Sequence, residues 1–220
     1  DLHSGANLVS FYALPDDLYI GNVLSSVEDN ITGVISEGSA ANYLGDDFWV
    51  GSLQYIDGLA GYWLKLTDDD ILELNGSLID PNSIFSLHSG ANLISYPFKD
   101  PQVLDDALGS AVNTIHALVG EGLAAMKMGD GWVGSMTTFE GGNGYWLIAT
   151  ENFTFTFNSN EGSLARLDEQ QPLPEAYRYL QSNKQAFYFI EDAIIEGESL
   201  NYDDIIIAYN NDVIVGARYW

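Results

Sequence analysis

Residues 2–10 read Leu-His-Ser-Gly-Ala-Asn-Leu-Val-Ser, and residues 87–95 repeat them with a single change, Ile94 for Val9. A period this long indicates tandem copies of a domain rather than a solenoid of short repeats. Three further blocks recur in the same order: Glu37-Gly38-Ser39-Ala40-Ala41 with Glu121-Gly122-Leu123-Ala124-Ala125, Trp49-Val50-Gly51-Ser52-Leu53 with Trp132-Val133-Gly134-Ser135-Met136, and Gly61-Tyr62-Trp63-Leu64 with Gly144-Tyr145-Trp146-Leu147. We expect a residue present in both copies to serve the shared fold.

The apolar pattern of each copy predicts several strands and one short helix of about three turns. Ile20, Val23, Leu24 and Val27 fall at helical spacing, and the second copy offers Leu104, Ala107, Leu108 and Ala111 at the same spacing. The strand-like runs of the first copy are residues 7–13, 31–36, 49–53, 62–66 and 71–74, and those of the second are 92–98, 115–119, 132–136, 145–149 and 153–157.

These elements predict a mainly β chain. We expect two tandem homologous modules, residues 1–84 and 85–160, each a small sandwich or open barrel with one short helix. Residues 158–175 are rich in Asn, Ser, Glu, Gln and Pro, and we expect residues 161–175 to form a linker.

Residues 176–220 hold too few strands for a complete module. The strand-like runs there are 185–190, 193–195, 205–209 and 213–217, and Asn210-Asn211-Asp212 predicts a tight hairpin turn between the last two. A sheet of this size buries little apolar surface and leaves open edges. We expect this third module to be truncated or to be completed by strands of another chain.

The charge of the chain is strongly negative, with 32 acidic residues against 7 basic ones and a formal net charge of −25. Such a surface repels phosphate backbones and anionic lipids, so nucleic acid and membrane partners are not expected. No apolar run approaches the roughly 20 residues of a membrane helix. The chain has no cysteine, which excludes disulfide scaffolds, zinc–thiolate sites and thiol catalysis.

The order of the repeated blocks resembles repeat modules of large secreted and cell-surface proteins from marine and Bacteroidota-like bacteria. The tail, from Gln185-Ala186-Phe187-Tyr188-Phe189 to Val215-Gly216-Ala217-Arg218-Tyr219-Trp220, resembles a second module found beside them. In the proteins that it resembles, this tail module usually continues past the Arg-x-Trp sequence. The resemblance implies an extracellular or cell-surface location, and it carries over no catalytic residues.

The histidines provide thin support for catalysis. His3 and His88 occupy equivalent positions, which favours a structural hydrogen-bonding role at the start of a strand, and His116 lies in a predicted strand without a partner motif. The sequence has no Gly-x-Ser-x-Gly, His-Glu-x-x-His or phosphate-binding glycine loop. We therefore expect a protein that is not an enzyme.

Acidic loops leave two interpretations open. Asp46-Asp47 and Asp68-Asp69-Asp70 gather carboxylates in predicted loops, and Ca²⁺ prefers six to eight hard oxygen ligands. Calcium is thus the one cofactor that the sequence suggests. The other interpretation is that these are solvated loop acids, because the second copy does not repeat the clusters.

The shared tryptophans also allow two roles. Trp49, Trp63, Trp132 and Trp146 are expected in the cores, since large aromatics dominate small cores. The unshared Tyr12, Tyr19, Tyr43 and Tyr55 are expected to be freer for surface contacts, such as stacking on sugars. The leading hypothesis is a structural or adhesive extracellular protein of a bacterial surface layer, fibre or matrix, which associates with itself or other surface proteins by strand-edge contacts. The alternative is a carbohydrate-binding accessory region of a secreted polysaccharide-degrading enzyme.

Overall fold

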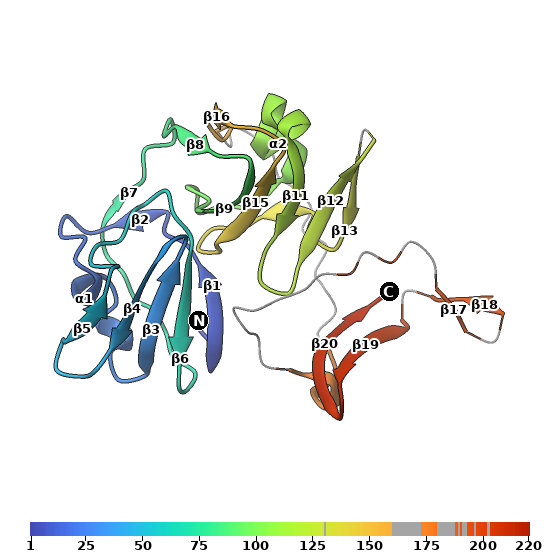
Figure 1. Ribbon diagram of the computed structural model, residues 1–220, viewed down its shortest axis with the longest axis horizontal. Helices are drawn as coiled ribbons and strands as arrows, with labels where there is room; N and C mark the ends of the chain where they lie inside the picture. The colour runs from blue at the N-terminus through green and yellow to red at the C-terminus, as the bar shows by residue number, and fades with distance from the viewer. Residues whose placement is uncertain are drawn as a thin grey trace. The chain divides into compact units, whose positions relative to one another are not determined.

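The computed structural model describes residues 1–129, 131–159, 173–179, 188, 190, 193–195, 197–201 and 203–220. The chain divides into two compact units, residues 1–165 and residues 166–220. Both sequence copies lie in the first unit, each as an antiparallel sheet with short helical segments (Figure 1). The predicted mainly β fold is confirmed.

The first copy forms a five-stranded sheet in the order β1-β6-β3-β4-β5, with every neighbouring pair antiparallel. Its strands are β1 (Gly5–Val9), β6 (Tyr62–Leu66), β3 (Ile31–Ser36), β4 (Ser39–Tyr43) and β5 (Trp49–Gly51). The edge strand β1 therefore begins the copy, and the short strand β5 forms the opposite edge.

The second copy repeats this topology in the sheet β9-β15-β11-β12-β13. Its strands are β9 (Gly90–Ile94), β15 (Tyr145–Ala149), β11 (Ile115–Val119), β12 (Ala124–Met128) and β13 (Gly131–Gly134). Even the irregularity of register is duplicated, between Ile31 and Gly33 in the first copy and between Ile115 and Ala117 in the second. The two copies thus share one fold.

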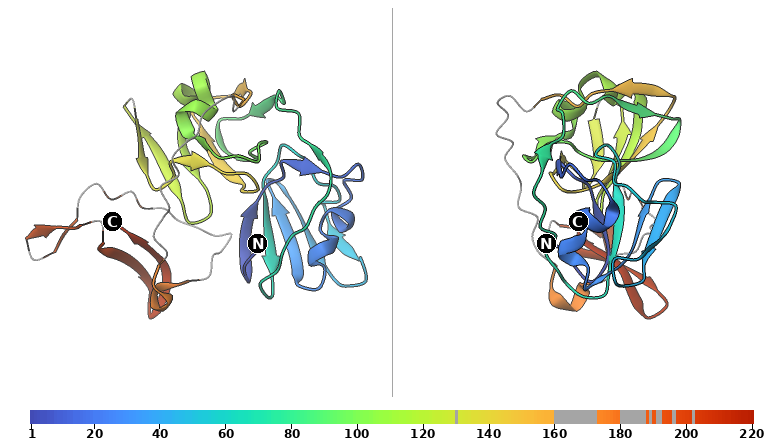
Figure 2. Two further views of the ribbon diagram at one scale, coloured as in Figure 1. Left: turned by 180° about the vertical axis from the view of Figure 1, so that it is seen from behind. Right: turned by 90° about the vertical axis from the view of Figure 1, so that its left-hand side faces the viewer.

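The predicted helices are present but shorter than three turns. α1 (Ile20–Val23) continues into the 3-10 turn η1 (Ser25–Val27), and α2 (Leu104–Leu108) continues into η2 (Gly109–Thr114). Their apolar residues are buried at the predicted spacing, with Ile20 and Val27 fully inaccessible. The helical segment of the first copy packs on one face of its sheet (Figure 2), because Ile20 and Val27 share a core with Val34 and Leu64.

Three two-stranded sheets complete the first unit. They are β2 (Ala13–Leu14) with β7 (Ser77–Leu78), β8 (Phe85–Leu87) with β16 (Phe153–Phe155), and β10 (Gln102–Val103) with β14 (Thr138–Phe139). β2 and β7 both belong to the first copy, and β8 and β16 both belong to the second. Each copy therefore closes on itself through its own first and last segments.

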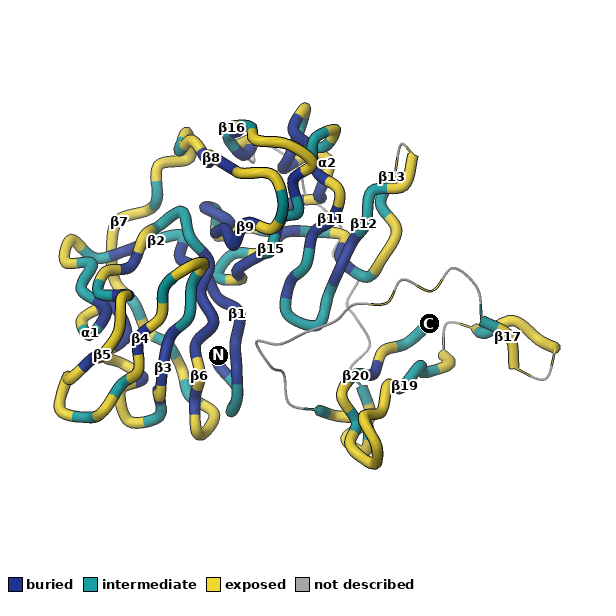
Figure 3. Tube along the Cα trace, in the orientation of Figure 1, coloured by how far each residue is buried: buried dark blue, intermediate teal, exposed yellow. Residues whose placement is uncertain are grey.

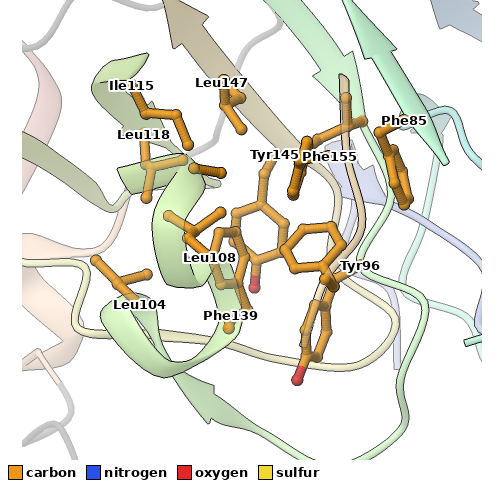
Figure 4. Packing of buried hydrophobic residues seen from close by; sticks show 14 of the residues in the cluster. Phe85, Tyr96, Leu104, Leu108, Ile115, Leu118, Phe139, Tyr145, Leu147 and Phe155 are labelled. Carbon is orange, nitrogen blue, oxygen red and sulfur yellow. The ribbon is translucent and has the colours of Figure 1, made fainter. Parts of the chain in front are cut away.

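Each copy has its own apolar core. In the second copy, aromatic rings from four segments meet around Tyr96 (Figure 4). Tyr96 stacks on Phe139 with ring centroids 5.4 Å apart, and Phe139 meets Tyr145 edge to face at 4.9 Å. Such aromatic pairs stabilise beyond the area that they bury. The burial colouring in Figure 3 shows the central strands of both sheets dark and β5 largely exposed.

Several segments differ from the sequence prediction. The predicted run 7–13 is interrupted between Val9 and Ala13, and the run 92–98 ends as a strand at Ile94. Residues 71–74 form no strand: Leu72 and Leu74 pack on the core, but Glu73 N donates to Ser26 Oγ instead of to a neighbouring strand. Apolar and polar side chains alternate in residues 71–74 because Leu72 and Leu74 pack on the core, although the segment has no strand partner. Conversely, β4 and β12 were not predicted, because Ala, Ser, Asn and Lys give them little apolar signal.

The second unit contains the predicted hairpin, β19 (Ile205–Asn210) with β20 (Val213–Tyr219). Asn211 has a φ of 54°, the left-handed conformation that tight hairpin turns require. The remaining described elements are β17 (Ile194–Ile195) with β18 (Glu198–Ser199), and the 3-10 turn η3 (Glu175–Tyr177). Residues 161–172 of the predicted linker, and most of the predicted strand 185–190, lie outside the described residues.

Among the described residues of the second unit, Ala217 is the one buried apolar side chain. Several apolar residues of its small sheets are exposed, including Ile195 and Val213 at 64% each. In the described part of the chain, no helix has the length and apolar character needed to cross a bilayer.

Candidate functional site at the seam between the two copies

The two copies meet along a seam, which we define by the outer edges of β1 and β9, the loops 57–61 and 140–144, and the hairpin turns at Glu37 and Glu121. Ser10 N donates to the carbonyl of Gly142 at 2.8 Å, and Gly144 N donates to the carbonyl of Leu8 at 3.1 Å. Each sheet's first edge is therefore closed by the loop of the other copy.

The reciprocal contacts occupy the equivalent positions. Ser95 N donates to the carbonyl of Leu59 at 3.0 Å, and Gly61 N donates to the carbonyl of Leu93 at 3.1 Å. The bridges Val9–Asn143 and Ala60–Ile94 repeat the same symmetry. The seam is thus isologous in form, because each copy offers the same surface to the other, as in a two-fold symmetric dimer.

Two glutamates reach across the seam from hairpin turns. Glu121 Oε2 accepts from Leu8 N at 2.6 Å, and its Oε1 lies 2.5 Å from His3 Nε2. Glu37 in turn accepts from Leu93 N at 2.8 Å, and its Oε1 lies 2.6 Å from His88 Nε2. One carboxylate therefore binds both a backbone N–H and an imidazole of the opposite copy.

Each glutamate is followed by a glycine that makes its turn possible. Gly38 and Gly122 have φ values of 73° and 68°, a conformation that residues with a Cβ rarely adopt. The turns join β3 to β4 and β11 to β12. The repeated Glu-Gly block is explained by a left-handed turn that carries a side chain to the other copy.

The two histidine rings present both nitrogens to acceptors. His3 Nδ1 lies 2.7 Å from the carbonyl of Ser4, and His88 Nδ1 lies 2.9 Å from the carbonyl of Ser89, while each Nε2 faces a glutamate. A neutral imidazole has only one N–H, so the arrangement satisfies both nitrogens only in the protonated, cationic form.

The pKa of both histidines is raised as a result. For His3, burial disfavours the charged ring, but the bonds to Glu121 and to the carbonyl of Ser4, with a smaller attraction from Asp69, outweigh it and raise the pKa. For His88, the carbonyl of Ser89 and the carboxylate of Glu37 raise the pKa. Below these raised pKa values, each protonated ring forms an ion pair with the glutamate of the other copy.

The rest of the repeated stretch holds the histidine in place. Asn7 Oδ1 accepts from His3 N at 2.8 Å, and Asn7 Nδ2 donates back to the carbonyl of His3 at 2.8 Å. Asn92 makes the same pair of bonds with His88. Both asparagines are buried, so each closes a loop whose backbone groups would otherwise lack partners.

The Gly-Tyr-Trp-Leu block builds the other side of the seam. A Cβ on Gly144 would lie 2.5 Å from the carbonyl oxygen of Val9, and one on Gly61 would lie 2.9 Å from that of Ile94. Both distances are shorter than a van der Waals contact, so only glycine allows the loop to approach the opposite strand. With any larger residue at these positions, the loop could not come close enough to form the hydrogen bonds from Gly144 N to Leu8 and from Gly61 N to Leu93.

The tyrosine of this block fixes the loop. Asp57 N donates to Tyr62 Oη at 2.6 Å, and Glu140 N donates to Tyr145 Oη at 2.7 Å. Both phenols are buried, and burial raises the pKa of Tyr62 to about 12 and raises that of Tyr145 as well. Each tyrosine therefore stays neutral and anchors the first residue of its seam loop.

The tryptophans that follow fill the seam itself. Trp63 is 3% exposed and packs with Ala6, Leu8 and Leu93, with Trp146 partly buried against the same cluster. Trp49 is buried in the first core, but Trp132 is only half-buried, with Nε1 donating to Asp105 at 2.9 Å. The expectation of buried tryptophans is therefore correct for Trp49 and Trp63 and only partly correct for Trp132 and Trp146.

The predicted calcium ligands lie in two separate loops. Asp46 and Asp47 are in the turn between β4 and β5, with φ values of 51° and 55°, while Asp68–Asp70 follow β6. At that end of the sheet, β3 lies between β6 and β4. Among the described residues, no group of three or more His, Cys, Asp or Glu side chains gathers as a metal site.

Two of these aspartates have hydrogen-bonding roles. Asp69 Oδ1 accepts from Ser4 N at 2.7 Å, and Asp70 accepts from Asn30 Nδ2 at 2.9 Å and from Ile71 N at 2.7 Å. In the second copy, Asn152 Oδ1 accepts from Ser89 N at 2.7 Å in the place of Asp69. A neutral amide thus performs the same task as the carboxylate.

His116, the third histidine, is exposed on β11 and outside the seam. The sequence marked His3, His88, Glu37 and Glu121 as duplicated, but it did not pair them, because each contact joins non-equivalent positions of different copies. No protein-family model, curated protein or solved structure matches this chain.

Proposed function

We propose that this chain is a non-enzymatic structural or adhesive component of an extracellular bacterial surface layer, fibre or matrix. The observation that carries the proposal is the use made of the duplicated residues. His3, Glu37 and Gly61, with their partners in the other copy, serve to lock the copies together. A duplication maintained for packing favours a building block over a binding cleft.

The edges of the two sheets that lie opposite the seam, formed by β5 and β13, supply surfaces for association. Among the described strands, none pairs with the outer side of β5 or β13. Val50 on β5 is 45% exposed, and its equivalent Val133 on β13 is 42% exposed. Leu44 and Phe48 add exposed apolar surface beside β5, at 64% and 60%. An unpaired edge with apolar side chains is a template for strand addition.

The net charge of −25 sets a condition for such association. Like-charged surfaces repel, and the repulsion is screened over about 8–10 Å at physiological ionic strength. Self-association is therefore expected to strengthen with salt or with divalent cations. A salty or cation-rich extracellular medium suits this requirement.

Light scattering across protein concentration, at low and at high salt, tests the proposal on the whole chain. We expect oligomers at high salt, and we expect Val50→Lys with Val133→Lys to reduce their mass, because a charge on each edge opposes strand addition. Ile71→Lys is the matched control, since Ile71 is 57% exposed outside any strand. A monomer under all conditions, or an equal loss in the control, contradicts the proposal.

One observation favours the carbohydrate-binding alternative. Tyr55 is 66% exposed and meets Tyr19 edge to face, with ring centroids 6.2 Å apart. An exposed aromatic ring of this kind can stack on a sugar face. A glycan array tests the alternative: micromolar binding that is abolished by Tyr55→Ala supports it, and the absence of glycan binding rejects it.

A further inference from the structure

We propose that the seam also forms between chains, so that the first copy of one molecule pairs with the second copy of another. The partner is therefore a second molecule of this protein, and the contacts are those that already join the two copies within one chain. This inference rests on the proposed function, because it supplies a way for the building blocks to link.

The connection between the copies is short and exposed. Ile79 N still donates to the carbonyl of Tyr12 in the first copy, and Phe85 already pairs with Phe155 in the second. Residues 80–84 form the hinge between them. A connection of this length spans at most about 20 Å when fully extended.

The hinge is a local turn. Ser83 N donates to the carbonyl of Asp80 at 3.0 Å, and Asn82 N donates to Asp80 Oδ1 at 2.9 Å. Ile84 is 64% exposed, so it has little apolar burial to lose. Opening the turn therefore sacrifices contacts within the hinge and leaves both cores intact.

The seam loses nothing in the exchange. Each half of it consists of hydrogen bonds, an ion pair and apolar packing between residues of different copies, and none of these requires the copies to share a chain. Exchange of identical elements through a hinge is a low-cost route to dimers. If the exchange closes on itself it gives a dimer, and if it continues from chain to chain it gives a fibre.

Concentration decides between the closed and the exchanged arrangement. A short linker gives the intrachain pair an effective concentration on the order of millimolar. Exchange between chains thus competes at about millimolar protein, or during refolding of a crowded sample.

Cysteine cross-linking gives a direct test, because the chain has no cysteine of its own. Val9 and Asn143 face each other as an isolated antiparallel bridge. Cα atoms in such pairs lie about 4.5–5.5 Å apart, within the range of a disulfide. The double variant Val9→Cys/Asn143→Cys should form an internal disulfide and establish that the seam has this geometry.

The two single variants are then mixed, refolded together at about 1 mM, oxidised and separated on a non-reducing denaturing gel. We expect a disulfide-linked dimer at least tenfold more abundant than in either variant alone, and more abundant at 1 mM than at 10 µM. A mixture of Val9→Cys with His116→Cys is the control, since His116 lies outside the seam. Linked dimer at the control level, while the double variant cross-links internally, overturns the inference.

Light scattering of the unmodified chain separates this result from the proposed function. Oligomers without seam disulfides between chains would overturn the exchange and leave association by strand edges in place. Absence of oligomers at every concentration would overturn both. Oligomers together with the mixed disulfide would support both.

Discussion

Glu121 of the second copy lies 2.5 Å from His3 of the first, and the same carboxylate accepts a hydrogen bond from Leu8 N. Glu37 makes the equivalent two contacts in the opposite direction. The two glutamates fix the register of the copies, because each binds one side chain and one backbone group of the opposite edge strand. Charge-assisted bonds of this kind are stronger than neutral ones.

Replacing Glu121 by Ala should destabilise the first unit by about 1–3 kcal/mol, because the buried N–H of Leu8 loses its acceptor. Glu121→Gln should cost less, since its amide oxygen still accepts from Leu8 N. Urea unfolding measures both. Glu73→Ala, at an exposed position outside the seam, is the control, and an equal effect of all three variants would contradict the assigned role.

The raised pKa values of His3 and His88 predict a pH-dependent seam. The free energy that the cationic rings contribute is fully present below the unfolded pKa, about 6.5. It is lost as the pH rises through the raised folded pKa. The melting temperature of the chain minus that of His3→Gln/His88→Gln should therefore shrink between pH 6 and pH 9.

The comparison with a variant removes the general effect of the chain's negative charge, which both proteins share. His116→Gln is the control, because His116 lies outside the seam. It should track the unmodified chain at every pH. A difference that stays constant or grows with pH for the double variant would show that the rings do not act as cations in the seam.

The central strands were predictable because their sequences carry their own signal. The predicted runs 31–36, 62–66, 115–119 and 145–149 coincide with β3, β6, β11 and β15, whose alternating or continuous apolar residues face the cores. β4 and β12 escaped prediction, since pairing with their neighbours rather than apolar content makes them strands. The local apolar pattern of the sequence therefore identified the core strands. It missed β4 and β12, which are strands because they pair with neighbouring strands.

The seam could not be predicted for a different reason. Duplication singled out His3, Glu37 and Gly61, but their partners are 118, 51 and 32 residues away, and no local pattern contains that pairing. The predicted role of the histidines in hydrogen bonding at the strand start agrees with the bonds to Ser4 and Ser89. The second bond of each ring, to the other copy, required the structure.

Gly144→Ala should destabilise the first unit by about 1–3 kcal/mol, the usual cost of overpacking. The added Cβ would lie 2.5 Å from the carbonyl oxygen of Val9 and would force the loop away from β1. Thermal unfolding should show a fall of roughly 2–4 °C per kcal/mol for a unit of this size. Gly131→Ala is the matched control, because its Cβ would meet no atom within 4 Å, and equal falls in both would contradict the close approach.

Asp69 provides a test of the calcium interpretation. Because Asn152 makes the equivalent bond in the second copy, Asp69→Asn should keep the hydrogen bond from Ser4 N and leave the melting temperature nearly unchanged. Asp69→Ala should lower stability by about 0.5–1.5 kcal/mol, the net value of a typical hydrogen bond. We expect both results to be the same with added calcium and with chelator. If calcium raises the melting temperature of the unmodified chain and Asp69→Asn abolishes that rise, the carboxylate is a metal ligand and its role is not that of a hydrogen-bond acceptor alone.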